Sequence, residues 1–316
     1  MKTILVTGGA GFIGSHVCDA LISRGDKVVC IDNFNDYYDP SFKHENIQHN
    51  IGKKNFVLVK GDFTEHDLLR GIFVEHKIDV ICHLGARAGV RPSIEQPLLY
   101  EEVNVKGTLN LLECAREFSV KHFVFASSSS VYGDRDKVPF SETDNVEHPI
   151  SPYAATKRTG ELMCYTYHHL YGIKCTCLRF FTVYGPRGRP DMAPYKFVQW
   201  VTEGKELTMF GDGSTKRDYT YIADIVSGVV ACIDKQFDYE IINLGNNNPV
   251  SLKEFISIVE NLVGKKAIIK KMPMQPGDVS MTYADVSKAG KLLGYKPTTS
   301  FAEGMKKFVE WYRSNR

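Results

Sequence analysis

The sequence lacks the features that mark membrane-spanning, secreted and repetitive proteins. None of its apolar runs approaches the roughly 18 residues that a membrane span requires. No apolar signal-peptide core stands near the N-terminus, where a strand-like run begins almost at once. Repeats, low-complexity tracts and flexible linkers are absent as well. At 316 residues the chain is long enough for one large domain or two modest ones, and we expect it in the cytoplasm without a membrane partner.

Neither charge of one sign nor reactive cysteine dominates the composition. The 39 Lys and Arg residues nearly balance the 37 Asp and Glu residues, which gives a net charge of +2. The basic residues are scattered instead of forming a patch or stripe, so we expect no nucleic-acid partner. The 8 cysteines include no C-x-x-C pair, and most lie in apolar stretches. They predict small buried thiols in a reducing compartment, and neither disulfides nor a metal site.

The first 180 residues alternate between strand-like and helix-like patterns. Runs rich in β-branched residues predict strands at 3–7, 27–31, 55–60, 79–84, 122–126 and 174–180. Helical patterns lie between them at 13–23, 67–76, 104–118 and 153–171. Apolar strands that are separated by helices predict a parallel sheet with right-handed crossovers. The fold class is therefore α/β, with a Rossmann-type doubly wound parallel sheet.

The pattern of residue types along the chain changes beyond Tyr184. Gly and Pro punctuate this part, and short strands are expected at 207–210, 239–244 and 267–271, with helices at 252–263 and 301–313. This pattern favours a smaller C-terminal α/β substrate-binding lobe over residues 185–316, beside the doubly wound domain over residues 1–184. We expect some exchange of chain between the two lobes.

A glycine-rich run, residues 7–14, joins the first expected strand to the first helix. Gly8 permits a tight turn, Gly11 lets the backbone approach a pyrophosphate, and Gly14 allows close packing of the helix. The helix N-terminus then offers N–H groups and a partial positive charge to that phosphate. Asp32 ends the second strand, where a carboxylate accepts hydrogen bonds from a ribose and repels a 2′-phosphate. The run therefore predicts an NAD-binding domain and favours NAD over NADP.

Asp62 follows the third expected strand, and two interpretations of it stay open. A carboxylate at this place can accept a hydrogen bond from the adenine amino group of a dinucleotide. An exposed loop aspartate can equally cap a helix or close a turn.

A tyrosine and a lysine one helical turn apart form a candidate catalytic pair. Tyr153 and Lys157 stand at i and i+4, on one helix face. An ammonium group beside a phenol stabilises the phenolate, and a bound nicotinamidium would add to that effect. We expect the two together to lower the pKa of Tyr153 below its usual value. Four serines, residues 127–130, directly follow the fifth expected strand, at the sheet edge where ligands bind. A serine hydroxyl there can contact both Tyr153 and a substrate oxygen.

These motifs together resemble the extended short-chain dehydrogenase/reductase family of nucleotide-sugar epimerases, dehydratases and decarboxylases. The resemblance covers nearly the whole chain, including the late segments 216–221 and 276–279. In that family the catalytic serine or threonine lies four residues before the tyrosine of a V-Y-G turn, here residues 131–133, which implies Ser128. Predicted contacts of the NAD cofactor are Gly8, Gly11, Phe12, Ile13, Gly14, Asp32, Asn33, Asp62, Phe63, Leu84, Ala86, Tyr153 and Lys157.

The residues after Ser128 indicate which reaction follows oxidation of the sugar at carbon 4. Dehydratases of the family carry an Asp-Glu pair directly after the catalytic residue, where this chain has Ser129 and Ser130. Decarboxylases resemble a Ser-Glu-Val-Tyr-Gly pattern, in which Ser130 replaces the glutamate. A serine cannot act as that carboxylate base. The resemblance therefore implies a 4-epimerase, in which the hydride returns to the opposite face of the ketone.

Three stretches resemble the UDP-glucuronate 4-epimerases: residues 32–40, 180–186 and 187–193. The resemblance makes Thr182 and Arg189 contacts of the sugar carboxylate, with Ser129 assisting. Oxidation of glucuronate at carbon 4 gives a β-keto acid, which loses carbon dioxide when its carboxylate swings perpendicular to the ketone. An arginine fork can hold the carboxylate in plane. We expect interconversion of UDP-glucuronate and UDP-galacturonate.

Other positions complete the predicted UDP-sugar site. Arg217 is expected on the diphosphate, since arginine binds phosphate in a bidentate way. Asp278 is expected beside Arg217 or on the uridine ribose, and Arg91 near the end of the fourth strand. Lys196 and Phe197 are expected to border the uracil. Arg87 departs from the epimerases, which more often have glutamine there.

Several alternatives stay open at this point. UDP-glucose or UDP-N-acetylglucosamine could be the epimerised sugar, or the chain could be a decarboxylase or a dehydratase. A non-catalytic NAD-binding protein would keep the same fold. The family forms dimers through two helices of each subunit, here 104–118 and 153–171, and Met163, Cys164, Tyr167 and Leu170 give the second helix an apolar face. We expect a homodimer, although the same apolar face is equally compatible with packing in the core of one chain.

Overall fold

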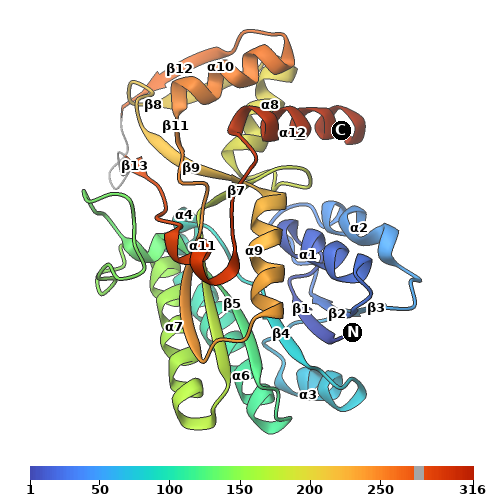
Figure 1. The fold of residues 1–316 in the computed structure, drawn as a ribbon. Helices are drawn as coiled ribbons and strands as arrows, with labels where there is room; N and C mark the ends of the chain where they lie inside the picture. The colour runs from blue at the N-terminus through green and yellow to red at the C-terminus, as the bar shows by residue number, and fades with distance from the viewer. Residues whose placement is uncertain (274–280) are drawn as a thin grey trace.

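A parallel sheet forms the centre of the computed structural model, which describes residues 1–273 and 281–316 (Figure 1). Its strands, in spatial order, are β10 (Tyr239–Leu244), β6 (Lys174–Phe180), β5 (His122–Ser128), β4 (Val80–His83), β1 (Thr3–Thr7), β2 (Lys27–Asp32) and β3 (Phe56–Lys60). Every neighbouring pair is parallel. The strand order reverses between β1 and β4, and ligands of open α/β sheets bind at such a switch point. The predicted doubly wound parallel sheet is confirmed.

Both faces of this sheet are buried, because alternate residues of each strand point to opposite sides. Ile4 and Val6 of β1 join one apolar cluster, while Leu5 joins a second cluster across the sheet. Helices α1 (Phe12–Ser23) and α9 (Ile222–Asp234) contribute to the first cluster. Helices α3 (His66–Glu75), α6 (Gly107–Glu117) and α7 (Pro152–Tyr171) contribute to the second.

A smaller lobe lies beyond the carboxyl ends of the sheet strands (Figure 1). Its larger sheet is built around β9 (Lys216–Tyr221), which pairs with β7 (Thr182–Tyr184), β11 (Pro249–Ser251) and β13 (Met281–Thr282). A two-stranded sheet joins β8 (Glu206–Phe210) to β12 (Ile268–Met272). Three helices cover these sheets: α8 (Ala193–Glu203), α10 (Leu252–Val263) and α12 (Phe301–Asn315).

Short elements connect the larger ones. They are α2 (Ser41–Ile47), η1 (Gln48–Asn50), α4 (Val90–Glu95), α5 (Pro97–Glu101), η2 (Glu102–Lys106), η3 (Ser129–Tyr132) and α11 (Ser287–Leu293). Of these, η2 is a π-helical turn, a distortion that is frequent at functional sites.

Local sequence signals set the ends of α7, which carries the candidate catalytic pair. The Ser151 hydroxyl accepts a hydrogen bond from the Ala154 N–H at 3.1 Å, and Pro152 occupies the first helical position. The helix ends at Gly172, which adopts a left-handed conformation. Tyr153 therefore lies in the first turn of the helix, and Lys157 lies one turn later.

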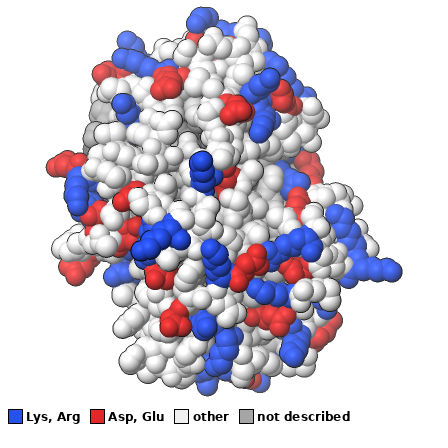
Figure 2. Space-filling model, in the orientation of Figure 1, with Lys and Arg blue, Asp and Glu red and all other residues white. Residues whose placement is uncertain are grey.

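The charges of the surface, the state of the cysteines and the length of the apolar helices can each be compared with the expectations from the sequence. Acidic and basic side chains are interspersed over the face seen in Figure 2. All eight cysteines are buried and free, which confirms that they act as small apolar side chains. Within residues 1–273 and 281–316, no helix is both long and apolar enough to cross a membrane.

Candidate active site

A cavity of about 660 Å³ opens at the switch point of the central sheet, between the two lobes. The carboxyl ends of β1, β4, β5 and β6 all reach it. Every residue predicted to contact the cofactor lines it. So do most of the residues predicted to contact the sugar nucleotide: Arg91, Ser128, Ser129, Thr182, Arg189 and Arg217.

The turn between β1 and α1 has no room for side chains at two of its glycines. Gly8 has a φ of +64°, and a Cβ there would lie 2.7 Å from the Cα of Gly85. A Cβ on Gly14 would lie 2.1 Å from the Gly8 carbonyl oxygen. The N-cap of α1 is Gly11, which makes no side-chain cap, so the first N–H groups of the helix are left to a ligand. This geometry fits the pyrophosphate of a dinucleotide.

The Asp32 carboxylate is buried at the end of β2 and has a fixed orientation. One oxygen accepts a hydrogen bond from the Ala10 N–H at 3.2 Å, and the other accepts from the Phe34 N–H at 2.9 Å. The Lys43 ammonium lies 3.5 Å from the same carboxylate and is also buried. Burial lowers the pKa of Lys43, and the charge of Asp32 opposes that shift.

Asp62 acts in a turn and lines the cavity as well. One carboxylate oxygen accepts hydrogen bonds from the N–H and the hydroxyl of Thr64 at 2.9 and 2.8 Å. The other accepts from the Asn33 amide at 2.6 Å. Asp62 therefore closes a turn, as one of the two interpretations expects. Because it also lines the cavity, a contact with adenine stays a prediction.

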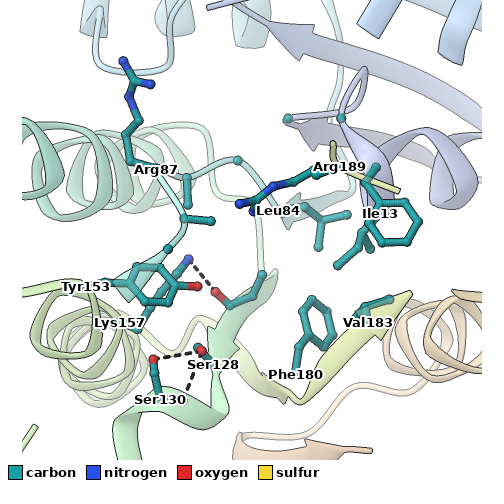
Figure 3. Close-up of a pocket in the computed structure, with 18 of the residues that line it drawn as sticks. Ile13, Leu84, Arg87, Ser128, Ser130, Tyr153, Lys157, Phe180, Val183 and Arg189 are labelled. Carbon is teal, nitrogen blue, oxygen red and sulfur yellow. Dashed lines mark hydrogen bonds between the residues drawn. The ribbon is translucent and has the colours of Figure 1, made fainter. Parts of the chain in front are cut away.

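Ser128, Tyr153 and Lys157 converge on the cavity floor (Figure 3). The Ser128 hydroxyl accepts hydrogen bonds from the backbone N–H and the hydroxyl of Ser130, at 3.1 and 2.9 Å. The Ser128 hydroxyl can therefore donate its own proton to another acceptor in the cavity. The same hydroxyl also contacts Tyr153. The Lys157 ammonium donates to the Ala126 carbonyl oxygen at 2.8 Å and lies 5.9 Å from the centre of the Tyr153 ring.

The other members of the serine run have separate places. The Ser127 hydroxyl donates at 2.6 Å to Glu161, which is fully buried and forms a bidentate ion pair with Arg179. Ser127 is therefore part of the protein interior. Ser129 and Ser130 line the cavity beside Ser128, without a carboxylate in either position.

Burial controls the titration of the catalytic pair. It raises the pKa of Tyr153, and the contact with Ser128 and the charge of Arg189 only partly oppose this. Burial also lowers the pKa of Lys157 to about 7. Without a cofactor the pKa of Tyr153 is therefore raised by desolvation, and the expected lowering by Lys157 together with a bound nicotinamidium stays a prediction.

Arg189 reaches into the cavity from the loop after β7 (Figure 3). Its Nε and Nη2 atoms donate to the two carboxylate oxygens of Asp191 at 2.9 and 2.6 Å. Its guanidinium also lies 5.2 Å from the ring centre of Tyr37. Thr182 lines the same region.

A model of the GDP-mannose 4,6-dehydratase family matches residues 5–308 of the chain. The chain belongs to this family. Its membership confirms the resemblance to extended short-chain dehydrogenases/reductases that the motifs indicate.

Several relatives of this chain are epimerases. A UDP-glucuronate 4-epimerase of Thermodesulfobacterium geofontis is 47% identical over 100% of this chain and 97% of its own. The structure of a Bacillus cereus UDP-glucuronic acid 4-epimerase with UDP-glucuronic acid and NAD has a TM-score of 0.93 and 38% identity, covering 99% and 100% of the two chains. A Thermotoga maritima UDP-glucose 4-epimerase with UDP-glucose has a TM-score of 0.91 and 33% identity, covering 99% of each chain.

Two predicted substrate contacts, Lys196 and Phe197, are not brought into the cavity. Phe197 lies in the core, only 7% exposed, with its ring centre 4.9 Å from that of Phe255. Lys196, its neighbour on α8, does not line the cavity. Asp278 lies outside the described residues. Arg187, which the sequence placed in the same loop as Arg189, points instead to α1 and pairs with Asp19 at 2.7 Å.

Sequence reasoning missed three residues that shape the site. Lys43 lies beside Asp32. The ring of Tyr37 is close to two guanidinium groups, with its centre 5.2 Å from that of Arg189 and 5.6 Å from that of Arg87. Asn104, in η2, bonds both the N–H and the carbonyl oxygen of Arg87, at 2.8 and 3.0 Å. It thereby fixes the loop between β4 and α4.

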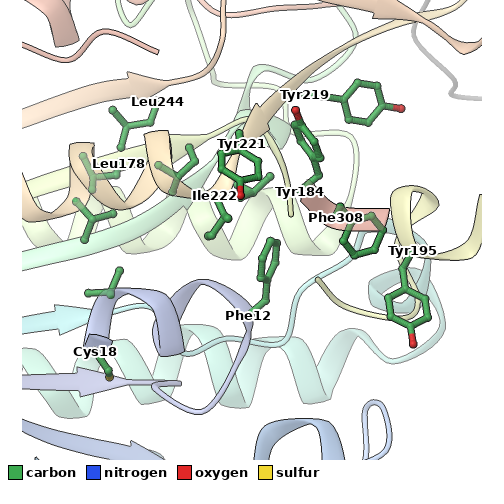
Figure 4. Packing of buried hydrophobic residues seen from close by; sticks show 14 of the residues in the cluster. Phe12, Cys18, Leu178, Tyr184, Tyr195, Tyr219, Tyr221, Ile222, Leu244 and Phe308 are labelled. Carbon is green, nitrogen blue, oxygen red and sulfur yellow. The ribbon is translucent and has the colours of Figure 1, made fainter. Parts of the chain in front are cut away.

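Phe12 couples the cofactor turn to the smaller lobe. It lines the cavity and also belongs to the larger apolar cluster. Figure 4 shows its ring directed toward Tyr221 and Ile222, at the start of α9. The turn that would hold a dinucleotide therefore packs on residues of the other lobe.

Proposed function

We propose that this protein is an NAD-dependent 4-epimerase that interconverts UDP-glucuronate and UDP-galacturonate. One observation carries the proposal. Among the residues that the structure describes, the cavity holds a Tyr–Lys–Ser centre without a neighbouring carboxylate base, and it holds Arg189 as well. The centre can move a proton reversibly, and the arginine can bind an acidic sugar. The UDP-glucuronate 4-epimerases among the relatives support the same substrate.

The residues around the glycine turn fit NAD. The α1 N-terminus would bind the pyrophosphate, Asp32 the adenosine ribose and Asp62 the adenine. Lys157 would bind the nicotinamide ribose. When bound, NAD takes a hydride from carbon 4 of the sugar and supplies it again. The NAD in the Bacillus cereus relative supports this assignment.

Tyr153 acts as the reversible acid and base. Its phenol oxygen takes the proton of the carbon-4 hydroxyl as the sugar is oxidised and returns a proton to the same oxygen afterwards. Ser128 donates a hydrogen bond to that oxygen, because its acceptor positions are used by Ser130. Lys157 lies beside the Tyr153 ring, where its charged form would offset part of the effect of burial on the pKa of Tyr153.

The neighbouring side chains exclude the competing reactions. Dehydration would need a base at carbon 5, and neither Ser129 nor Ser130 can provide one. Arg189 and Thr182 would hold the sugar carboxylate in the plane of the carbon-4 ketone and thereby suppress its loss as carbon dioxide. Arg91 and Arg217, which also line the cavity, would bind the diphosphate.

Incubation of the purified protein with UDP-glucuronate, followed by chromatographic separation of the products, tests the proposal. We expect UDP-galacturonate to accumulate to equilibrium without net consumption of NAD. Release of carbon dioxide with a UDP-pentose, or the absence of UDP-galacturonate, would refute the assignment.

A UDP-glucose 4-epimerase is the second candidate, and one observation favours it. The charge of Arg189 is already compensated by Asp191, so a neutral sugar would not leave that arginine unpaired. The similarity to the Thermotoga maritima enzyme is consistent with this candidate. The two candidates differ in their dependence on Arg189.

We also propose that the protein is a cytoplasmic homodimer that pairs through α6 and α7. Apolar side chains are exposed on these helices: Leu109 at 36%, Leu162 at 50% and Leu170 at 59%. Cys164 and Tyr167, expected on this face, belong to the core instead. We expect sedimentation equilibrium to give twice the mass of one chain, and a monomer at micromolar concentration would contradict the proposal.

A further inference from the structure

The ion pair between Arg189 and Asp191 divides the donors of the guanidinium group into two edges. Asp191 occupies the side formed by Nε and Nη2. Of the five N–H groups of an arginine, this leaves the two on Nη1 and one on Nη2 for other acceptors. Those three lie on the end of the side chain, which in Figure 3 reaches into the pocket among Ile13, Leu84 and Tyr153. A second carboxylate can therefore bind Arg189 end-on while Asp191 stays in place.

Asp191 contacts the cavity through Arg189. Asp191 itself does not line the cavity, although its partner Arg189 and the next residue in the chain, Met192, do. Burial alone would raise the pKa of Asp191, but the hydrogen bonds and charge of Arg189 outweigh it and hold the pKa below its usual value. The carboxylate is thus charged at neutral pH, and it remains a strong acceptor for the guanidinium.

The plane of the guanidinium is fixed from two directions. Asp191 holds it along one edge, and the guanidinium carbon packs 5.2 Å from the centre of the Tyr37 ring. The backbone adds to this restraint, because the Met192 N–H donates to the Arg189 carbonyl oxygen at 3.2 Å. A planar group that is held along one edge by two hydrogen bonds and packed beside an aromatic ring presents its remaining edge in a preferred orientation.

We propose that Asp191 is a positioning residue that sets the orientation of Arg189, so that the 4-keto uronate is reduced again before it loses carbon dioxide. This inference rests on the proposed function, since it concerns the fate of an acidic sugar. A carboxylate bound by a bidentate fork lies in the plane of that fork. The orientation of the Arg189 plane therefore determines the angle between the sugar carboxylate and the carbon-4 ketone.

The step that Asp191 suppresses is the decarboxylation of a β-keto acid. In it the bond between carbon 5 and carbon 6 breaks, and carbon 6 leaves as carbon dioxide. The electron pair of that bond passes to carbon 5 and the ketone oxygen as an enolate, which takes a proton at carbon 5 to give a UDP-4-keto-pentose. The reduced cofactor formed in the preceding oxidation stays on the enzyme unless it reduces this ketone. The break requires the bond to stand perpendicular to the ketone plane, which a fixed Arg189 prevents.

The test uses Asp191→Asn with UDP-glucuronate whose carboxyl carbon is labelled. We expect the ratio of labelled carbon dioxide to UDP-galacturonate to rise by at least about tenfold over the natural protein, because small misplacements at a reacting centre change rates strongly. The KM for UDP-glucuronate should not rise, since Arg189 keeps its charge. Absorbance of bound reduced cofactor should grow in parallel with the carbon dioxide.

Asp19→Asn is the matched control. It breaks the other ion pair of the same loop, between Arg187 and Asp19, whose side chains do not line the cavity. We expect its product ratio to equal that of the natural protein. If Asp191→Asn only lowers turnover or thermal stability and leaves the ratio unchanged, Asp191 has a structural role and the inference is overturned.

Asp191→Glu covers the case in which the asparagine variant does not fold. It keeps the charge and shifts the guanidinium, so it should raise the ratio as well. An unchanged ratio in the folded glutamate variant would also overturn the inference. The natural protein, assayed in parallel, separates the two proposals: if it makes no UDP-galacturonate, the proposed function fails, whatever the variants do.

Discussion

Replacing Tyr153 by phenylalanine should lower kcat for UDP-glucuronate by about 10²- to 10⁴-fold, the range that a positioned acid or base contributes. The variant keeps the ring but loses the oxygen that takes and returns the proton of the carbon-4 hydroxyl. The Tyr153 ring packs edge-on against Tyr100, with ring centres 6.2 Å apart, and this contact survives in phenylalanine. Binding of NAD, measured by calorimetry, should change little.

Tyr132→Phe serves as the control for loss of a buried tyrosine hydroxyl. Tyr132 is buried and donates to the Asn243 side chain at 2.6 Å, but it does not line the cavity. We expect it to lose some thermal stability and to keep its turnover. If Tyr153→Phe turned over within about tenfold of the natural protein, less than the 10²-fold minimum for a catalytic acid or base, the catalytic assignment would be wrong and a non-catalytic NAD-binding protein would have to be considered.

Replacing Arg189 by alanine should have the second largest effect, and only on the acidic sugar. Loss of one partner of a desolvated charge pair costs about 2–5 kcal/mol, so kcat/KM for UDP-glucuronate should fall by about 30- to 5,000-fold. The turnover that remains should release more carbon dioxide, because nothing then holds the carboxylate in plane. Turnover of UDP-glucose, where it can be measured, should change by less than about threefold, since a neutral sugar loses no such pair.

Arg187→Ala is the control for the loop that carries Arg189. It removes a guanidinium two residues away that pairs with Asp19 outside the cavity. We expect its kinetics with both sugars to resemble those of the natural protein. An Arg189→Ala variant that kept full activity on UDP-glucuronate would favour the UDP-glucose candidate, and an equal loss on both sugars would make Arg189 a general structural element.

The elements with local signals could be predicted from the sequence almost to the residue. Strand β6 has the predicted bounds, and α7 begins one residue before the prediction, because Ser151, Pro152 and Gly172 mark its ends. Helix α2 has no such pattern and was not predicted, although it carries Lys43 to Asp32. The position of Tyr37 was equally hidden, since only the folded chain brings residues 37 and 189 together.

The catalytic centre was predictable because its residues share short spacings, whereas the uracil contacts were not. Tyr153 and Lys157 lie one turn apart, and Ser128 is set by its distance to the V-Y-G turn. Phe197 was expected at the uracil, but it lies on the buried stripe of α8 with Pro194, Val198 and Val201. That helical periodicity is a signal for core packing that the sequence already contained. The pKa of Tyr153 depends on burial, which no spacing reveals.

Strand β10 is the last strand of the central sheet along the chain. It pairs with β6 from a position some 60 residues later, after β7 and β9 of the smaller lobe. While the chain emerges from a ribosome, the edge of β6 therefore stays unpaired until residue 244 is available. An unpaired parallel edge is a template for association with other chains. The last strand of the central sheet is thus made only after β7, β8 and β9 of the smaller lobe, so neither lobe can complete its fold before part of the other has been synthesised.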